Sequence, residues 1–194
     1  MRNKKYAGII VGAILIFLVI YVVATYNSLV KKDEMVKKQW AEVQSTYQRR
    51  LDLVPNLVNI VKGLSDFEQT TLENIANARS RALAGQSNVI SGENYNEQQR
   101  LQDSVAAATN RLIVVIEKYP ALKGTAAYSG LQTQLEGTER RIKVARNDFN
   151  AAIAAYNTAV RSSNTMLVAK IFGFRPKEGF KAATGAEKRV EINF

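Results

Sequence analysis

The sequence contains neither cysteine nor histidine. Without cysteine the chain has no disulfide, thiolate metal site or catalytic thiol, and without histidine it lacks the commonest general base and the commonest zinc ligand. No Walker, Gly-x-Gly-x-x-Gly or Gly-x-Ser-x-Gly motif is present either. We therefore expect no catalytic residue, no metal site and no cofactor, and we interpret the protein as not an enzyme.

Proline is scarce, occurring only at positions 55, 120 and 176, and the apolar residues between these positions recur at helical spacing. This pattern predicts an all-α fold, in which an N-terminal transmembrane helix is followed by an antiparallel up-and-down four-helix bundle with long helices. We divide the chain into a basic N-terminus (1–5), a transmembrane anchor (6–26), a helical bundle (27–163) and an amphipathic basic tail (164–194).

Residues 7–25 carry no charge. At about 1.5 Å of rise per residue, this run nearly spans a hydrocarbon core of roughly 30 Å. A cleaved signal peptide is the alternative, but the run exceeds the usual length of roughly 7–15 apolar residues, which favours a retained anchor. The side chains expected to face lipid are Tyr6, Ile9, Ile10, Leu15, Phe17, Leu18, Tyr21 and Tyr26.

The net charge is +10. Most of the excess basic residues lie on either side of this run or after residue 161, and they do not concentrate on one surface that could bind nucleic acid. This distribution favours a membrane surface over nucleic acid as the partner. Basic residues lie on both sides of the run, so the positive-inside rule nearly cancels. A short basic start leading directly into an apolar run is typical of a signal anchor, which predicts that the bundle lies outside the cytoplasm.

Four helices are predicted after the anchor. In the first, one stripe consists of Val36, Trp40, Val43, Tyr47, Leu51, Val54, Val58 and Val61, a second of Leu53, Leu57, Ile60 and Leu64, and Pro55 predicts a kink or restart near Asp52. In the second, Ser65 or Asp66 would be the N-cap, and the buried face would be Leu72, Ile75, Ala76, Ala82 and Leu83. The third (93–119) would bury Leu101, Val105, Ala108, Leu112 and Val115. In the fourth, a coiled-coil seam is formed by Leu131, Leu135, Thr138, Ile142, Ala145, Phe149, Ala152 and Tyr156.

Several motifs resemble the LemA family. The most specific is Arg-x-Asp-Leu-Val-Pro-Asn-Leu at residues 50–57, and the resemblance extends over roughly residues 26–174. Where LemA proteins usually carry Phe-Pro, this chain has Ser163-Asn164. Further similar positions are Tyr26-Asn27, Ala78-Arg79, Tyr119-Pro120, Leu131-Gln132, Leu135-Glu136, Thr138-Glu139, Ala145-Arg146 and Tyr156-Asn157.

The resemblance implies a membrane anchor followed by a helical bundle, and a family without an established enzymatic activity. Some similar proteins carry a lipidated cysteine in place of a span, and one branch is associated with magnetosome membranes. The lipidated cysteine implies a bundle outside the cytoplasm, and both features imply work at a bilayer. We expect a single-pass protein of the bacterial inner membrane, with its bundle on the periplasmic or extracytoplasmic side. The Tyr-Asn pairs at 26–27 and 156–157 are interpreted as packing and capping residues.

A set of charged residues lies beside the apolar stripes, and buried charges require partners. We expect these residues to form an interhelical polar network. A di-iron site is disfavoured because it needs histidine, while a calcium site built from Glu136, Glu139 and Asp148 has no acidic loop to support it. The network residues are Arg49, Arg50, Asp52, Arg79, Glu117, Glu136, Glu139 and Arg146.

The tail combines apolar, aromatic and basic residues between Met166 and Lys181, as interfacial membrane segments do. It would either contact a membrane or a partner, through Lys170, Phe172, Phe174 and Arg175, or fold back onto the bundle. The last five residues alternate as a strand does and could join the sheet edge of a partner, but we expect them to be disordered.

The function that fits these features best is a membrane-anchored helical scaffold that self-associates or binds a membrane protein, with no small-molecule substrate identified. We expect the apolar face of Leu51–Leu64 and the seam of the fourth helix to leave surface for such contacts. The alternative is a ligand-sensing bundle coupled to a separate membrane partner.

Overall fold

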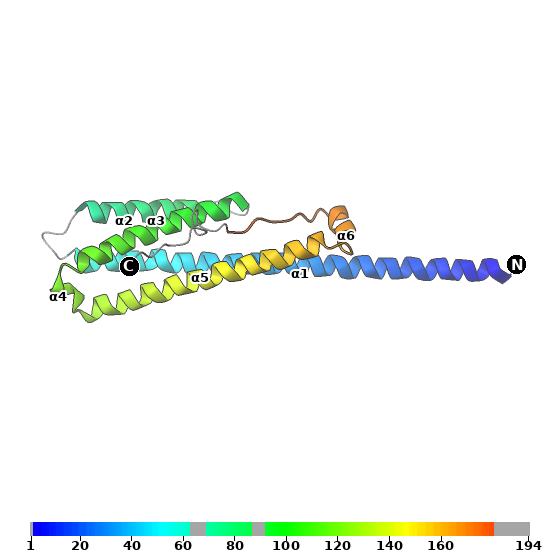
Figure 1. Ribbon diagram of the computed structural model, residues 1–194, viewed down its shortest axis with the longest axis horizontal. Helices are drawn as coiled ribbons and strands as arrows, with labels where there is room; N and C mark the ends of the chain where they lie inside the picture. Colours follow the sequence, from blue (N-terminus) through cyan, green and yellow to red (C-terminus); the bar gives the residue numbers. More distant parts are fainter. Residues whose placement is uncertain (1, 63–68, 87–91, 181–194) are drawn as a thin grey trace, which may run out of the picture. The chain divides into compact units, whose positions relative to one another are not determined.

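A computed structural model of the protein describes residues 2–62, 69–86 and 92–180. Within these ranges every regular element is a helix and none is a β-strand, which confirms the predicted all-α class (Figure 1). The elements are α1 (Arg2–Val61), α2 (Gln69–Gln86), α3 (Gly92–Ile116), α4 (Pro120–Lys123), α5 (Ala126–Arg161) and α6 (Met166–Ile171).

The chain forms two compact units, and α1 and α5 contribute to both. The anchor unit comprises residues 1–40 and 151–177, and the core unit comprises residues 41–150 and 178–194.

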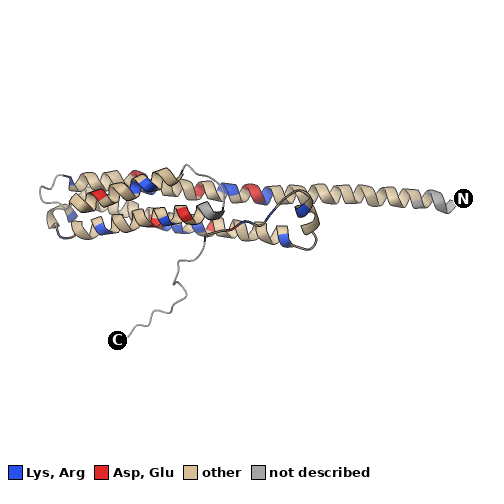
Figure 2. Ribbon diagram, turned by 90° about the horizontal axis from the view of Figure 1, so that it is seen from above, with Lys and Arg blue, Asp and Glu red and all other residues tan. Residues whose placement is uncertain are grey.

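Helix α1 is 60 residues long, which corresponds to about 90 Å at 1.5 Å per residue. Its apolar N-terminal stretch is exposed along its length, and it makes α1 the one helix in the described chain that is long and apolar enough to cross a membrane. Figure 2 shows this stretch without a blue or red residue along its described part.

The core unit contains one hydrophobic core to which four helices contribute. Helix α2 packs against α3, and each helix supplies the face on which its buried apolar residues recur every three or four positions. The fully buried members are Leu51, Leu53, Val54, Leu57 and Val61 from α1, Ile75, Ala78 and Ala82 from α2, Val105, Leu112 and Ile116 from α3, and Tyr128, Leu131 and Leu135 from α5.

The anchor unit has a smaller core of its own. Its buried apolar side chains come from α1 (Leu29, Val36, Trp40), α5 (Ile153, Tyr156, Val160) and α6 (Val168, Ala169).

The predicted stripes agree with the structure to different degrees. Every seam position predicted for α5 is buried except Ala152, which is half-buried. On α2, Ala76 is exposed and Ala78 is buried in its place. Residues 64–66 and 190–194, for which further features were predicted, lie outside the described residues. On α3, the buried stripe differs from the predicted one and contains Gln98, Gln102, Val105, Thr109, Leu112 and Ile116.

Of the kink or restart predicted near Asp52, the restart is wrong, because α1 continues through Pro55 to Val61. Proline has no N–H, so the carbonyl of Leu51, four residues earlier, loses its helical donor. The Nε of Arg79 on α2 donates a hydrogen bond to this carbonyl at 2.9 Å. A side chain from a neighbouring helix therefore satisfies the backbone group that the proline leaves free.

Helix α6 follows α5 after a short turn and ends in a Schellman motif. Gly173 has a φ of 76°, in the left-handed region that glycine adopts without steric cost. The N–H of Gly173 donates to the carbonyl of Lys170 at 3.3 Å, and the N–H of Phe174 donates to that of Ala169 at 2.9 Å. From here the chain runs without helix to Phe180, and we call residues 174–180 the C-terminal strap.

Candidate functional site: a polar network and the C-terminal strap

Arg50 lies at the centre of the buried polar network in the core unit. Its Nη1 donates to the backbone carbonyl of Gln102 on α3 at 2.9 Å, and its Nη2 donates to the carboxylate of Glu139 on α5. The Arg50 side chain is almost fully buried, whereas that of Glu139 is half-exposed. A guanidinium in such a position needs both partners, because an unpaired buried charge is unstable. The pair joins three helices at one level of the core.

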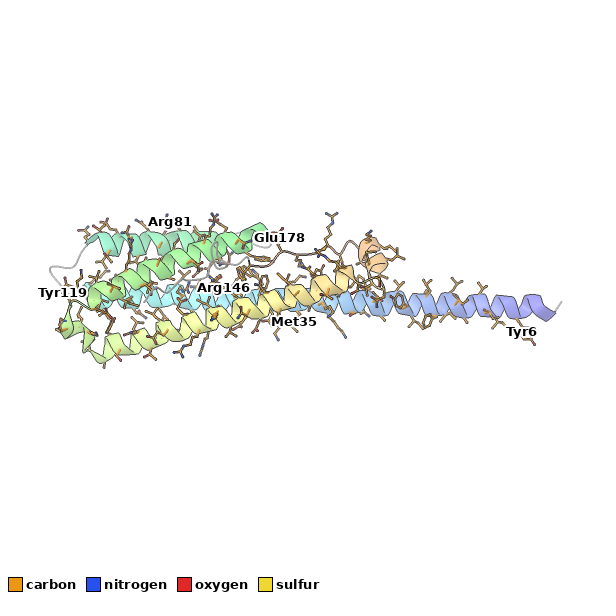
Figure 3. The ribbon with its side chains drawn as sticks, in the orientation of Figure 1. Tyr6, Met35, Arg81, Tyr119, Arg146 and Glu178 are labelled. Atoms are coloured by element: carbon orange, nitrogen blue, oxygen red, sulfur yellow. The ribbon has the colours of Figure 1, made fainter. Side chains whose placement is uncertain are left out.

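Arg146 forms a second polar centre, labelled in Figure 3. Its Nε donates to the hydroxyl of Tyr47 at 2.8 Å, and its Nη2 donates to the carboxylate of Asp103 at 3.0 Å. Burial raises the pKa of the Tyr47 hydroxyl, and the positive charge of Arg146 only partly offsets this effect. Burial alone would lower the pKa of Arg146, but Tyr47 and Asp103 outweigh it and raise that pKa. Arg146 therefore remains charged.

The other predicted network residues lie at the surface. Arg49 is exposed and donates to Gln134 at 3.0 Å, and Asp52 accepts from Gln48 of its own helix at 2.7 Å. Glu136 accepts from Gln132, again within one helix, and Glu117 is exposed. Of the predicted set, the structure thus joins Arg50 to Glu139 and brings Arg49, Arg79 and Arg146 to partners on other helices.

Three partners in this network did not emerge from the sequence: Tyr47 as a hydroxyl acceptor, Gln102 and Asp103. Gln102 had a usable signal, because Gln98, Gln102, Val105, Thr109 and Leu112 alternate steps of four and three. That spacing is a helical face whatever its polarity. A polar residue on such a face is a better candidate for a buried network than a charged residue beside it.

The C-terminal strap is held in the core unit by an asparagine that binds its backbone. The side-chain amide of Asn150 donates to the carbonyl of Phe180 at 3.3 Å and accepts from the N–H of Phe180 at 2.9 Å. The Phe180 ring lies 5.4 Å from the ring of Phe149 and 6.4 Å from that of Tyr95. The guanidinium carbon of Arg146 lies 5.6 Å from the centre of the same ring. This end of the strap is therefore fixed by its backbone and by one aromatic side chain.

The anchor unit holds the strap in the same way through Asn157. Its amide donates to the carbonyl of Lys177 and accepts from the N–H of Lys177, both at 2.8 Å. The Nζ of Lys177 forms an ion pair with Asp33 on α1 at 2.9 Å and lies 5.4 Å from the centre of the Tyr156 ring. Asn157, which we interpreted as a packing or capping residue, instead binds the strap.

Asp33 forms ion pairs with two lysines in this unit, Lys37 and Lys177. Burial alone would raise the pKa of its carboxyl, but hydrogen bonds and charges from Lys177 and Lys37 outweigh burial and lower that pKa. Burial and the nearby Asp33 charge together raise the pKa of Tyr156. Asp33 is therefore ionised and Tyr156 neutral near neutral pH.

Helix α6 presents two different faces in the anchor unit. Val168 and Ala169 are buried, while the tail residues predicted to contact a membrane or partner are mostly exposed: Lys170, Phe172 and Arg175. Phe174 is half-buried and lies 5.8 Å from the ring of Tyr26. The tail thus packs one side onto the protein and leaves the other uncovered.

The predicted lipid-facing residues of the anchor are all exposed in the protein. Within the described ranges, no group of three or more acidic side chains is arranged to hold a metal ion. The carboxylate of Glu139, one of the residues considered for a calcium site, is instead paired with Arg50. The geometry is that of a structural polar network and of a strap whose backbone is bound by two asparagines.

Comparison with known proteins agrees with the resemblance found in the sequence. The sequence profile of the LemA family matches residues 39–194. The chain is similar to the magnetosome protein MamQ of Magnetospirillum gryphiswaldense, with 27% identity over 174 residues, and to the magnetosome protein MamQ 1 of Paramagnetospirillum magneticum, with 26% identity over 177 residues. Each alignment covers 80% of this chain but 64% of the relative, so the chain spans less than two thirds of the length of these proteins. It is also similar to the protein LemA of Metamycoplasma hominis, with 24% identity over 156 residues, covering 80% of this chain and 68% of the relative.

Proposed function

From the premise that this chain belongs to the LemA family, we propose that it is a non-enzymatic scaffold held in a membrane by a single N-terminal span. In this proposal α1 crosses the bilayer at residues 6–26. The helices that follow form an antiparallel up-and-down four-helix bundle, which assembles with further copies or with another membrane protein. The role of this assembly is to organise or remodel the membrane.

The observation that carries the proposal is the continuity of α1. Its N-terminal part is apolar and uncovered, which is favourable in lipid and unfavourable in water. Without a break, the same helix continues to Val61 and contributes Leu51, Leu53 and Leu57 to the core. One helix therefore serves both as the span and as a central element of the folded part.

The four helices α1, α2, α3 and α5 support a bundle because they share one core. Short connections between successive helices favour antiparallel neighbours. Helix α4, four residues long with Pro120 at its start, connects α3 to α5. Hence the up-and-down arrangement is the one that these connections favour.

We place the bundle on the periplasmic or extracytoplasmic side of the bacterial inner membrane. The basic N-terminus leads directly into the span, as in a signal anchor, although basic residues also follow the span. Three relatives carry the name magnetosome protein, which associates this family with a membrane compartment and supports a role in membrane organisation.

The ligand-sensing alternative is favoured by hollows in the core unit, one of which lies beside Arg50. The hollow beside Arg50 is lined by Thr109, Gln132 and Glu139 among others, with a volume of about 220 Å³. Sites for small organic ligands usually measure roughly 300–1,000 Å³. This hollow is small for such a ligand. Two larger hollows of the core unit, about 460 Å³ beside Asn74 and Arg111 and about 480 Å³ beside Asn59 and Gln134, lie more open to solvent. The scaffold therefore remains our proposal, because it rests on the uncovered apolar part of α1.

Self-association would use a different surface from the one that the sequence pattern suggested. The apolar faces of α1 around Leu51 and Leu57 and the seam of α5 are buried in the core, so they are not available for contact. The span is uncovered and contains Gly8 and Gly12, four residues apart, with no atom within 4 Å of the position of an added Cβ at either glycine. Small residues at this spacing allow two membrane helices to approach closely.

The test is the oligomeric state of the full chain in mild detergent, measured by light scattering and repeated in nanodiscs by mass photometry. We expect dimers or larger assemblies, and we expect Gly12→Ile to shift them toward monomer without changing the helical circular dichroism. Ala13→Ile introduces the same side chain on another side of the span and serves as the matched control.

A strictly monomeric chain at all accessible concentrations would contradict self-association. If a metabolite then raised the melting temperature of that monomer in a screen, we would replace the scaffold proposal with the ligand-sensing one.

A further inference from the structure

The exposed face of α6 is apolar to an unusual degree for a helix of six residues. Leu167 and Ile171 are each 69% exposed and Phe172 is 50% exposed, while Val168 and Ala169 on the opposite face are buried. Val168 and Ala169 hold α6 against the rest of the anchor unit, so the exposed apolar face of α6 has a fixed orientation in that unit. Large apolar side chains grouped in this way usually mark a contact with another molecule or with lipid.

Contacts within the anchor unit place α6 beside the C-terminal end of the span. The hydroxyl of Tyr21 donates a hydrogen bond to the carbonyl of Asn164, two residues before α6. The ring of Tyr26 lies 4.9 Å from that of Phe172, directly after α6. Tyrosines concentrate at the level of the lipid headgroups. Because their partners lie just before and just after α6, this helix lies at that level too.

Positive charge accompanies the apolar face. Lys170 lies between Leu167 and Ile171 in sequence and is exposed, and Arg175 is exposed just after the Schellman motif. Lysine and arginine near a membrane extend their charged ends toward the headgroups while their alkyl stems cover apolar surface. Apolar side chains with interspersed basic ones are the composition of segments that bind in the interface of anionic bilayers.

We infer that α6 is a second membrane-binding element, inserted in the headgroup region of the same bilayer that α1 spans. The inference rests on the proposed membrane anchoring, and the lipid continues from the uncovered face of the span onto Leu167, Ile171 and Phe172. Because α6 leads directly into the C-terminal strap, the bilayer surface also fixes where the strap begins. The protein is then attached to the membrane at two points, which sets the orientation of the anchor unit as well as its position.

The chain offers a direct test because it has no native cysteine to remove. Ile171→Cys and, separately, Leu167→Cys would carry a nitroxide spin label in the full chain, reconstituted in vesicles of phosphatidylcholine and phosphatidylglycerol. Collisions with oxygen, which concentrates in lipid, and with a water-soluble nickel chelate report the depth of each label. Ile14→Cys in the span is the lipid reference, and Val144→Cys, an exposed apolar residue of α5 in the core unit, is the aqueous reference.

We expect both α6 labels to be several-fold less accessible to nickel than the Val144 label, and more accessible to oxygen. If they match the Val144 label while the Ile14 label is protected from nickel, the inference is overturned and the anchoring stands. If the Ile14 label is also in water, the proposed anchoring itself fails. Protection from both reagents, with dipolar broadening between labels, would overturn the inference by assigning this face to a second copy of the chain.

Discussion

Arg50 illustrates how a single side chain stabilises three helices in this protein. Its guanidinium is buried, yet its carboxylate partner Glu139 is half-exposed, so the two members of the pair are unequal. Removing Glu139 leaves the buried Arg50 cation without its counter-charge, and an unpaired buried charge destabilises the fold strongly. Glu136, one turn earlier on α5, provides a natural comparison because it is exposed and is bonded within its own helix.

We predict that Glu139→Ala lowers the free energy of unfolding by about 3 kcal/mol. Glu139→Gln should lose less, because the amide oxygen still accepts from Arg50. Glu136→Ala should change stability by less than about 0.5 kcal/mol. Urea unfolding of the full chain in detergent, followed by circular dichroism, measures all three. Equal losses for the Glu136 and Glu139 variants would show that the buried pair does not stabilise the fold.

The spacing of the apolar residues identifies a few charged residues as candidates for this network. It does not show which of them point into the core. Arg49 and Arg50 are adjacent, and both flank an apolar stripe, yet only Arg50 points inward. Which one does so depends on the rotation of α1 against α3 and α5, which the pattern along one helix does not contain. Gln102 shows the opposite error, since its position on the buried face was readable but its polarity made it look like a surface residue.

At the scale of the elements, α1 and α2 compensate for a proline. Pro55 removes the donor for the Leu51 carbonyl, and Arg79 supplies another from α2. The continuity of α1 at this position thus depends on a residue outside α1. The proline in turn gives α2 a fixed point of attachment that an ordinary helix would not offer, because a regular helix carbonyl already has its partner.

A double-mutant cycle tests this coupling. Arg79→Met should destabilise the protein by about 1–2 kcal/mol, because it leaves the Leu51 carbonyl without a donor. In a Pro55→Ala background the restored N–H can bond to that carbonyl, so the same substitution should cost clearly less. Arg81→Met is the control, since the bond that Arg81 makes among the described residues lies within its own helix. Additive effects of Arg79 and Pro55 would refute the coupling.

The elements differ in how far their sequence predicted them. The seam of α5 was readable because a heptad repeat continues through most of the helix, whereas α3 carries apolar residues on more than one side and the predicted stripe was rotated. Helix α6 and the strap were taken as one interfacial segment. Gly173 was an available stop signal for α6, but two asparagines that bind the backbone of the strap leave no pattern in the strap itself.

At the scale of the whole molecule, the charge of the chain leaves its orientation in the membrane undecided by sequence. Arg2, Lys4 and Lys5 precede the span, and Lys31, Lys32, Lys37 and Lys38 follow it. The positive-inside rule compares such groups on the two sides of a span, and here they are similar in size. The two orientations place the same fold in different compartments.

We predict that the bundle faces away from the cytoplasm. In intact cells whose outer membrane has been made permeable, an impermeant maleimide should label Ser104→Cys, an exposed position on α3, but not Asn3→Cys before the span. The two variants are reciprocal controls, because they lie on opposite sides of one membrane helix. Labelling of Asn3→Cys alone would place the bundle in the cytoplasm.

The ion pair between Asp33 and Lys177 joins residues that are made at different times during synthesis, so it forms late in folding. The ribosome makes Lys177 about 140 residues after Asp33, a delay of roughly 7–30 s at common rates of bacterial synthesis. The span precedes both residues and can enter the membrane during that interval. Closure of the strap is therefore the last step in the assembly of the anchor unit, and a chain that has been cut short before Lys177 would expose Asp33 and the free amide of Asn157. Such an unfinished chain would already be membrane-bound, with a binding site for an extended peptide left open.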